Sequence, residues 1–211
     1  SRKNYLTDQY EVLSEEQSKL PRIYLEHDTP RQHPPNTKHI MQDDEVTFVH
    51  VTHFNQLMWD NGDIKTTVIE HGVVQPNVAF TGEIEKGIVV INNLPSRGRL
   101  LGLDLFLEAR KHVPLDLVGM CNGQLGSGDI PLPELPAFIS MYRFFFHPIR
   151  WTSLGLAVCE AMMAGIPIVG IAATELSTVI QNEHSGFIHT DLNYLIHKMK
   201  LLLNDKNLAA Q

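Results

Sequence analysis

Short apolar runs alternate with polar and amphipathic segments along the chain. The first three runs, RIYLEH (22–27), EVTFVHVT (45–52) and TTVIEHG (66–72), have the length and the β-branched or aromatic content of buried strands. Between the first two lies DTPRQHPPNTKH, whose prolines and histidines predict a surface loop. The run His53, Phe54, Asn55 predicts the start of a helix.

The alternation becomes more regular from about residue 73 onward. Further strands are predicted at 86–93, 114–120, 144–149, 167–172 and 187–190. Helices are predicted at 100–112, 132–142, 154–165, 174–186 and 191–205. Apolar strands that alternate with helices indicate a parallel sheet covered on both faces. We therefore expect an α/β fold, with a doubly wound parallel sheet over residues 73–211 and a separate, partial domain over residues 1–72.

Composition narrows the class of protein. The 211 residues are 43% apolar and carry a net charge of −7 without a dense Lys/Arg stripe, which argues against a nucleic-acid partner. Cys121 and Cys159 form neither a metal spacing nor a disulfide framework and suit a reduced, cytoplasmic protein, as small residues in or near the core. No apolar run is long enough to span a bilayer, and no signal peptide is recognised. The chain starts at Ser1 without methionine in a polar stretch, so we expect a fragment of a longer protein.

Two turns at the expected carboxyl ends of the strands carry candidate binding groups. Ligands of doubly wound sheets bind at this edge. LPSRGRLLG follows VVINN and contains Arg97 and Arg99, two side chains suited to grip a diphosphate. RWTSLG follows FFFHPI and leads into the next helix. Thr152 or Ser153 would cap that helix. The anion site would be formed by the backbone amides of Leu154, Gly155 and Leu156.

Glu160 is the one charged residue of the apolar stretch 151–170. It lies about one and a half turns into the predicted helix, where its two carboxylate oxygens would meet the vicinal hydroxyls of a ribose. The alternative for Glu160 is a carboxylate on the solvent-facing side of an amphipathic helix. The alternative for Arg97 and Arg99 is that they are solvated charges of a surface loop. A metal site from His27, Asp28, His33 and His39 is a further alternative, but its spacing matches no helical or Cys/His ligand pattern.

The sequence from FFFHPIRWTSLG through CEAMMAGIPIVG to LLLND resembles the donor-binding domain of retaining glycosyltransferases with the GT-B fold, the large family 4 group. Glu160, Ala161, Met162, Gly165 and Pro167 match the family's E-A-M-A-x-G-x-P run. VVINNLPSRGRLLGLDLFLEA is similar to the family's strand, basic turn and helix. HVTHFNQLMWDNGDIKTTVIEHGV looks like the end of the N-terminal domain and the linker. The resemblance covers roughly residues 20–205.

The resemblance implies roles for single residues. Glu160 takes the position of the glutamate that binds the nucleotide ribose, and RIYLEHDTP places His27 as the catalytic-cleft histidine. Thr152 stands where the family has its first glutamate, and Leu101 stands where it has a lysine. We therefore expect Arg97 and Arg99 to supply the positive charge.

The implied function is sugar transfer from a UDP- or GDP-linked donor to a glycan or lipid-linked acceptor, with retention and without a required metal or other cofactor. Residues 1–72 would be the remnant of the acceptor-side domain, and residues 73–211 the nucleotide-sugar-binding domain. We expect the fragment alone to be weak or inactive, and the parent to be cytoplasmic, with peripheral association at the inner membrane face left open. The alternatives are a non-catalytic nucleotide or glycan binding module of the same fold and a nucleotide-sugar epimerase.

Overall fold

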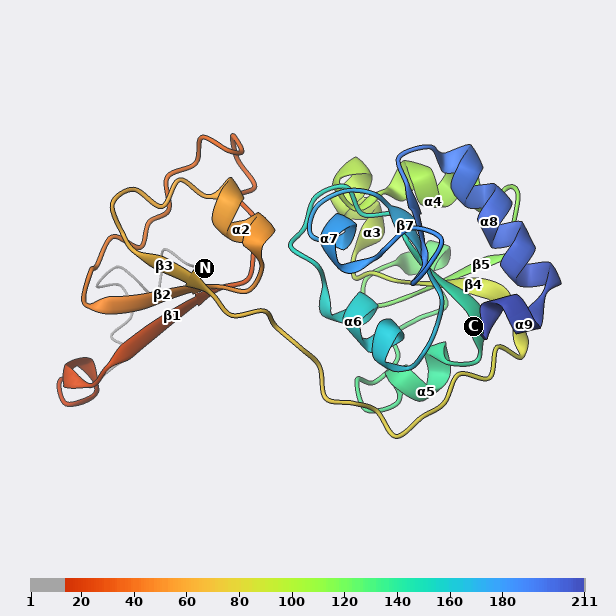
Figure 1. Ribbon diagram of the computed structural model, residues 1–211, viewed down its shortest axis with the longest axis horizontal. Helices are drawn as coiled ribbons and strands as arrows, with labels where there is room; N and C mark the ends of the chain where they lie inside the picture. Colours follow the sequence, from red (N-terminus) through yellow and green to blue (C-terminus); the bar gives the residue numbers. More distant parts are fainter. Residues whose placement is uncertain (1–13, 211) are drawn as a thin grey trace. The chain divides into compact units, whose positions relative to one another are not determined.

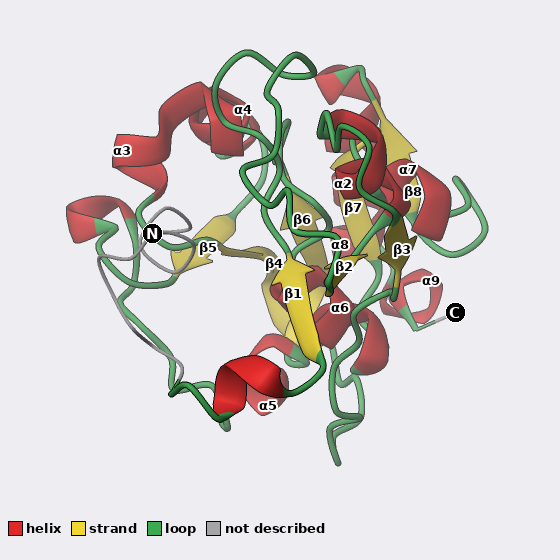
Figure 2. Ribbon diagram, turned by 90° about the vertical axis from the view of Figure 1, so that its left-hand side faces the viewer, coloured by secondary structure: helices red, strands yellow, loops and turns green. Residues whose placement is uncertain are grey.

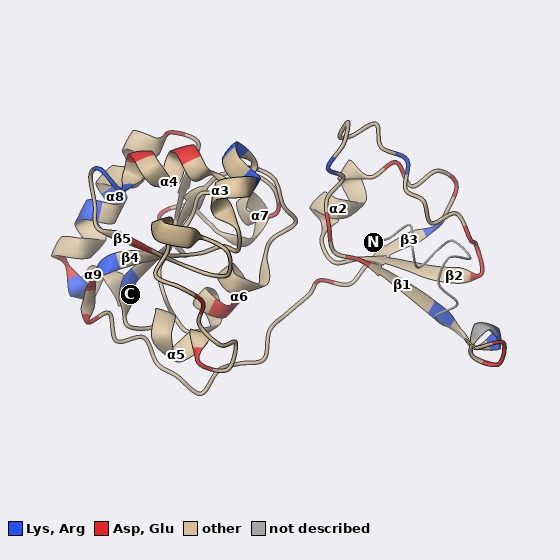
Figure 3. Cartoon of the chain, turned by 180° about the vertical axis from the view of Figure 1, so that it is seen from behind, with Lys and Arg blue, Asp and Glu red and all other residues tan. Residues whose placement is uncertain are grey.

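The computed structural model describes residues 14–210, which fold as two compact units that divide between His71 and Gly72 (Figure 1). Each unit contains its own parallel sheet. Figure 3 shows basic and acidic residues interspersed over the helices and loops of both units. Among residues 14–210, no helix combines the length and the apolar character that crossing a bilayer requires.

The first unit is a three-stranded parallel sheet in the order β1-β2-β3. Its elements are the 3-10 turn η1 (Gln17–Lys19), β1 (Arg22–Glu26), β2 (Val46–His50), α2 (His53–Met58) and β3 (Thr66–Val68). The helix predicted at His53 is present, and it begins there because the Thr52 side chain accepts a hydrogen bond from the Asn55 N–H at 3.0 Å. The loop between β1 and β2 packs inward through His39 and Met41, which lie against Phe48.

A buried polar pair holds this loop. His39 Nδ1 accepts a hydrogen bond from the Met41 N–H, so the ring proton lies on Nε2 and is donated to Glu26 Oε2 at 2.9 Å. Both side chains are almost fully buried. The His39 ring also packs edge-on against the Trp59 ring, with centroids 4.7 Å apart. The pair therefore anchors the chain that follows β1.

The second unit is a five-stranded parallel sheet in the order β5-β4-β6-β7-β8, with helices on both faces (Figures 1 and 2). Its strands are β4 (Ile84–Val90), β5 (Leu115–Val118), β6 (Tyr142–His147), β7 (Ile168–Ile171) and β8 (Phe187–His189). Its helices are α3 (Leu94–Arg97), η2 (Gly98–Leu101), α4 (Leu103–Ala109), η3 (Gly123–Leu125), α5 (Leu135–Ile139), α6 (Leu156–Met163), α7 (Leu176–Val179), α8 (Leu192–Asn204) and α9 (Lys206–Ala209). The predicted α/β class with a doubly wound parallel sheet is confirmed.

The central strand β6 explains why the sheet is covered on both faces. All six of its residues are buried. Phe144 and Phe146 pack into the core under α4 and α8, whereas Phe145 packs into the core under α5 and α6. Successive side chains of a strand point to opposite faces, so a continuous apolar run needs a helical layer on each side.

The strand order creates a topological switch point between β4 and β6. The chain leaves β4 toward its neighbour on one side, β5, and leaves β6 toward its neighbour on the other side, β7. The chain therefore runs to opposite sides of the sheet after β4 and after β6, and open parallel sheets bind their ligands in a crevice at the carboxyl edge beside such a point. Both turns singled out in the sequence lie at this edge.

Candidate functional site at the carboxyl edge of the second sheet

The turns after β4 and β6 lie in direct contact. The Arg150 N–H donates to the Leu100 carbonyl at 3.2 Å. Gly102 has a φ of +81°, and a Cβ at this position would lie 2.1 Å from the Pro148 carbonyl oxygen. Only glycine fits this close approach without a shift of the backbone. The single helix predicted over 100–112 is consequently interrupted, and a 3-10 turn ends at Leu101 before α4 begins at Leu103.

An ion-pair cluster joins the two turns. Arg150 donates from Nη1 to Asp104 Oδ1 at 2.6 Å and from Nη2 to Asp104 Oδ2 at 2.8 Å. Arg99 donates to the same Oδ2 at 2.6 Å, and Arg150 also donates to the Arg99 carbonyl. The Arg150 guanidinium holds the pKa of the Asp104 carboxyl below its ordinary value. Two arginines share one carboxylate, so the cluster carries one net positive charge.

The two arginines expected from the sequence differ in their surroundings. Arg97 ends α3 and is exposed. Arg99 is 76% exposed even though it pairs with Asp104. Both lie beside the crevice on the chain that follows β4, but neither lines the pocket described below.

Asparagine side chains brace the turns after β4 and β5. Asn92 Oδ1 accepts from the Met120 N–H at 2.8 Å. Asn122 Oδ1 accepts from the Leu94 N–H, and its Nδ2 donates to the carbonyls of Ile91 and Gly119. Asn122 is buried, so these hydrogen bonds satisfy an amide that would otherwise be costly to bury. The floor of the crevice is thereby fixed.

The predicted cap of α6 is wrong. Helix α6 begins at Leu156 after Gly155, which has a φ of +92°, and no side chain caps it. The turn at Gly155 delays the helix, so neither Thr152 nor Ser153 occupies the capping position. Ser153 and Leu154 are buried. Of the three predicted amides, only that of Leu156 lies in the first helical turn; Leu154 precedes the helix and Gly155 flanks it.

The first turn of α6 leaves the amides of Leu156, Ala157 and Val158 without intrahelical acceptors. The anion site stays a prediction, and the amides available for it lie about two residues further along the chain than expected.

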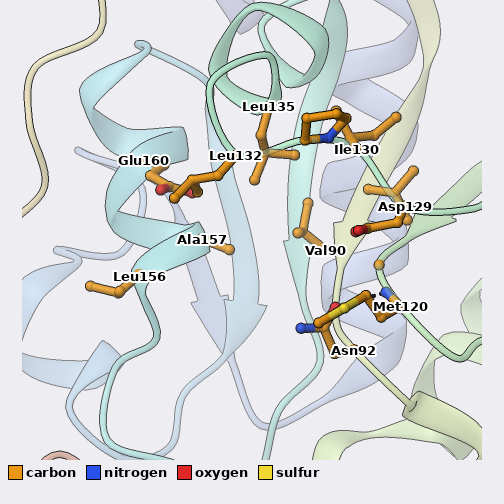
Figure 4. Close-up of a pocket in the computed structure, with 13 residues that line it drawn as sticks. Val90, Asn92, Met120, Asp129, Ile130, Leu132, Leu135, Leu156, Ala157 and Glu160 are labelled. Atoms are coloured by element: carbon orange, nitrogen blue, oxygen red, sulfur yellow. Dashed lines mark hydrogen bonds between the residues drawn. The ribbon is translucent and has the colours of Figure 1, made fainter.

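Glu160 lies in a pocket at the switch point (Figure 4). The pocket has a volume of about 420 Å³. It is lined from β4 and its loop by Val90 and Asn92, from β5 and its loop by Val118, Gly119 and Met120, from the chain before and in α5 by Asp129, Ile130, Pro131, Leu132 and Leu135, and from α6 by Leu156, Ala157 and Glu160. Volumes of 300–1,000 Å³ with mostly apolar walls and a few polar groups are typical of small-molecule sites.

The Glu160 carboxylate is half-buried and has no hydrogen-bond or ion-pair partner among residues 14–210. Burial raises the pKa of its carboxyl above the ordinary value. Burial, and to a smaller extent the negative charge of Glu160, raises the pKa of the neighbouring Cys159 thiol. A carboxylate held in a pocket without a protein partner can accept hydrogen bonds from a ligand.

Polar groups without partners also lie at the ends of β6 and β7. His147 is buried, its Nε2 has no hydrogen-bond partner in the described chain, and desolvation lowers its pKa to about 4. Its Cε1 atom lies 3.9 Å from the position that a Cβ on Gly155 would take. Thr174 follows β7 with a φ of +57°, and its buried hydroxyl likewise has no partner in residues 14–210. Such backbone strain is concentrated at functional sites.

His27 lies in the first unit, one residue after β1, and is exposed. It is close enough to His71 that its charge, added to the larger effect of burial, lowers the pKa of His71. The alternative metal set does not assemble, because His39 points into the core toward Glu26. Within the described residues, no three His, Cys, Asp or Glu side chains are grouped as a metal site. Both cysteines are free, and Cys121 is exposed in the turn after β5, contrary to the expected core position.

Several residues at this edge were missed from the sequence: Asn92, Asp104, Asn122, Asp129 and Arg150. The asparagines carried a signal, because Asn near the end of a strand commonly satisfies backbone groups in the turn that follows. Asp104 and Arg150 carried none, since their pairing depends on the contact between two loops separated by 46 residues.

Comparison with known proteins found one family model that matches part of the second unit. Residues 123–205 match the family model described as glycosyl transferases group 1. This segment runs from η3 through α8 and includes Asp129, Arg150 and Glu160. No curated protein sequence matches the chain.

Solved structures show the same fold at low sequence identity. A variant of S. aureus TarM in complex with fondaparinux, alpha-GlcNAc-glycerol and UDP matches with a TM-score of 0.69 and 14% identity, over 92% of this chain and 46% of that one. Sucrose-phosphate synthase from Thermosynechococcus elongatus matches with a TM-score of 0.62 and 17% identity, over 78% of this chain and 50% of that one. Anabaena HepE in complex with UDP matches with a TM-score of 0.61 and 15% identity, over 90% of this chain and 64% of that one. The chain thus spans about half the length of TarM and of the synthase.

Proposed function

We propose that this chain forms the nucleotide-sugar donor site of a retaining GT-B glycosyltransferase of the family 4 type. The observation that carries the proposal is the position of Glu160, an unpaired carboxylate in a pocket at the switch point of the second sheet. The match of residues 123–205 to the group 1 glycosyl transferases supports it. The donor is a sugar linked to a nucleoside diphosphate, and the acceptor is a glycan or a lipid-linked glycan. The parent protein acts in the cytoplasm, with association at the inner membrane face as a further expectation.

Each group beside the pocket takes one part of the donor in this proposal. Glu160 accepts hydrogen bonds from the two ribose hydroxyls. The diphosphate lies at the first turn of α6, where amides and the positive end of the helix dipole stabilise negative charge. Arg97 and Arg99 add positive charge from the β4 side. The role of His27 as the catalytic histidine stays a prediction from the family resemblance.

In the transfer step the bond between the anomeric carbon and the diphosphate oxygen breaks. The acceptor hydroxyl oxygen bonds to that carbon on the same face, and its proton passes to the leaving diphosphate. The negative charge that develops on the diphosphate is stabilised by preorganised amides and by the arginines. This chain's residues therefore act mainly by binding and charge stabilisation.

Replacing Glu160 with alanine tests the proposal. Each hydrogen bond to a charged group contributes about 1.5–3 kcal/mol, so nucleotide affinity should fall roughly tenfold to a few hundredfold. The measurement is calorimetric titration of UDP and GDP into the wild-type chain and the variant. Glu134→Ala is the matched control, because Glu134 is exposed and lies outside the pocket lining. Equal affinities of wild type and Glu160→Ala would remove Glu160 from the site.

A non-catalytic binding module with the same fold would pass this binding test. Sugar transfer by the intact parent protein distinguishes the two functions, because the module would bind nucleotide without turnover.

A further inference from the structure

The pocket contains a second carboxylate opposite Glu160. Asp129 lies between η3 and α5, on the wall formed by the chain that follows β5. Figure 4 shows the Asp129 and Glu160 carboxylates pointing into the same pocket from opposite sides. Neither has a hydrogen-bond or ion-pair partner in the described part of the chain. Two acceptor-only groups thus face one cavity.

Apolar side chains form the walls of the pocket around Asp129. They come from the end of β5, from the turn after it and from the chain before α5: Val118, Met120, Ile130 and Leu132. A flat aromatic ring can pack against such walls. The polar edge of that ring would meet Asp129, while a ribose attached to it would extend toward Glu160 on α6. A volume of about 420 Å³ accommodates a nucleoside.

The chemistry of Asp129 selects among bases. An ionised carboxylate only accepts hydrogen bonds, so the ring edge that faces it must donate. Guanine presents N1–H and the 2-amino group side by side, which matches the two oxygens of a carboxylate. Uracil presents one N3–H between two carbonyl oxygens, which the carboxylate repels. Adenine presents an amino group beside the unprotonated N1.

We infer that Asp129 is the specificity-determining residue of the donor site and that the donor is a guanosine diphosphate sugar. The inference rests on the proposed function, because it assumes that a nucleotide ribose lies at Glu160. The solved structures that contain UDP share only 14–15% identity with this chain, and at that level the likeness extends to the fold and not to the base.

The experiment compares three nucleotides by calorimetric titration: GDP, UDP and inosine diphosphate, which retains N1–H but lacks the 2-amino group. A good bidentate pair discriminates by about tenfold to a hundredfold, so GDP should bind the wild-type chain more tightly than UDP by this factor. Inosine diphosphate should bind about tenfold more weakly than GDP, because one of the two hydrogen bonds is lost.

Asp129→Asn gives the discriminating result. Its amide offers one donor and one acceptor, so it should lose the preference for GDP over inosine diphosphate and bind UDP more tightly than the wild type does. Glu134→Gln, which removes the same charge from a nearby exposed position, should keep the wild-type ratios. Asp129 is exposed, and thermal unfolding without nucleotide checks that the variant is folded.

The outcomes separate the two proposals. UDP binding at least as tight as GDP, or unchanged ratios in Asp129→Asn, would overturn the role of Asp129 and leave the donor site at Glu160 intact. If no nucleotide binds the wild-type chain, the proposed function fails and the base preference fails with it.

Discussion

Arg150 connects the two turns that border the crevice, and its removal should weaken both the fold and the site. Arg150→Ala deletes the bidentate pair with Asp104 and the hydrogen bond to the Arg99 carbonyl. Arg150→Lys keeps the charge but cannot reproduce the two parallel hydrogen bonds. The loop that carries Arg99 would then lose its tie to the chain that follows β6.

The magnitude follows from the exposure of the pair. The two side chains are 31% and 34% exposed, so the pair lies between a surface ion pair, at about 0.2–1 kcal/mol, and a hydrogen-bonded buried charge, at about 1.5–3 kcal/mol. We expect Arg150→Ala to lower the free energy of unfolding by about 1–2 kcal/mol, and Arg150→Lys by about half as much. Nucleotide affinity should fall severalfold in both variants, because the turn that carries Arg99 is no longer held by Arg150.

The pH dependence has a definite sign. The pKa of Asp104 is lowered in the folded protein, so its pair contributes stability above the unfolded pKa and loses it as the pH falls through the folded pKa. The difference in the free energy of unfolding between wild type and Arg150→Ala should therefore be largest near neutral pH and become smaller as the pH falls.

Urea unfolding followed by circular dichroism, at neutral and at acidic pH, measures these differences. Lys111→Ala is the control, because Lys111 pairs with Glu108 in an exposed contact and should change stability by less than about 0.5 kcal/mol. If Arg150→Lys is as stable as wild type and binds nucleotide equally well, the bidentate pair of Arg150 with Asp104 does not hold the two turns together as argued.

Three other substitutions probe separate parts of the structure. Thr174→Gly should raise the unfolding free energy by about 1 kcal/mol, since relief of a positive φ exceeds the added freedom of the unfolded chain; a lower urea midpoint would contradict this. Glu160→Gln should stabilise the nucleotide-free chain at neutral pH but not below the ordinary carboxyl pKa, because a raised pKa makes the folded state less favourable once the group ionises; thermal unfolding at both pH values measures it. His39→Ala should cost about 1.5–3 kcal/mol, because it removes the buried donor to Glu26 Oε2 while the Asp28 N–H still binds Glu26 Oε1. Urea unfolding followed by Trp59 fluorescence measures it, and a loss below about 1 kcal/mol would count against the pair.

The strands of the second sheet were predictable because burial on two faces requires continuous apolar runs. β6 is the clearest case, since its short aromatic run is typical of a strand covered on both sides and all six of its residues are buried. The buried character predicted for residues 22–27 is wrong, since β1 exposes Ile23 and Leu25. The strand order and the switch point were not predictable in detail, because they depend on which strands pair and not on the pattern within each strand.

The helix boundaries at the site depended on contacts that the local sequence does not show. Gly102 takes a positive φ where two loops approach each other, and Gly155 takes one in the turn before α6. These turns moved the starts of α4 and α6 past the predicted positions. The capping residues Thr152 and Ser153 were chosen from local preference, which the turn at Gly155 overrode.

The site itself was predictable at one position. Glu160 drew attention as a lone charge in an apolar helix, and it does line the pocket. Asp129 gave no such signal, because an acidic residue in a Gly-rich turn is ordinary. Its significance appears only when the chain between η3 and α5 folds across from α6.

The contact between Glu160 and a ribose is the central claim, and removal of the ribose hydroxyls tests it most directly. Titration of GDP and 2′,3′-dideoxy-GDP into the wild-type chain and Glu160→Ala forms a closed cycle. We expect loss of the hydroxyls to weaken binding at least tenfold in the wild type and to have little effect in the variant. An equal loss in both proteins would contradict it, because the hydroxyls would then contact some other group.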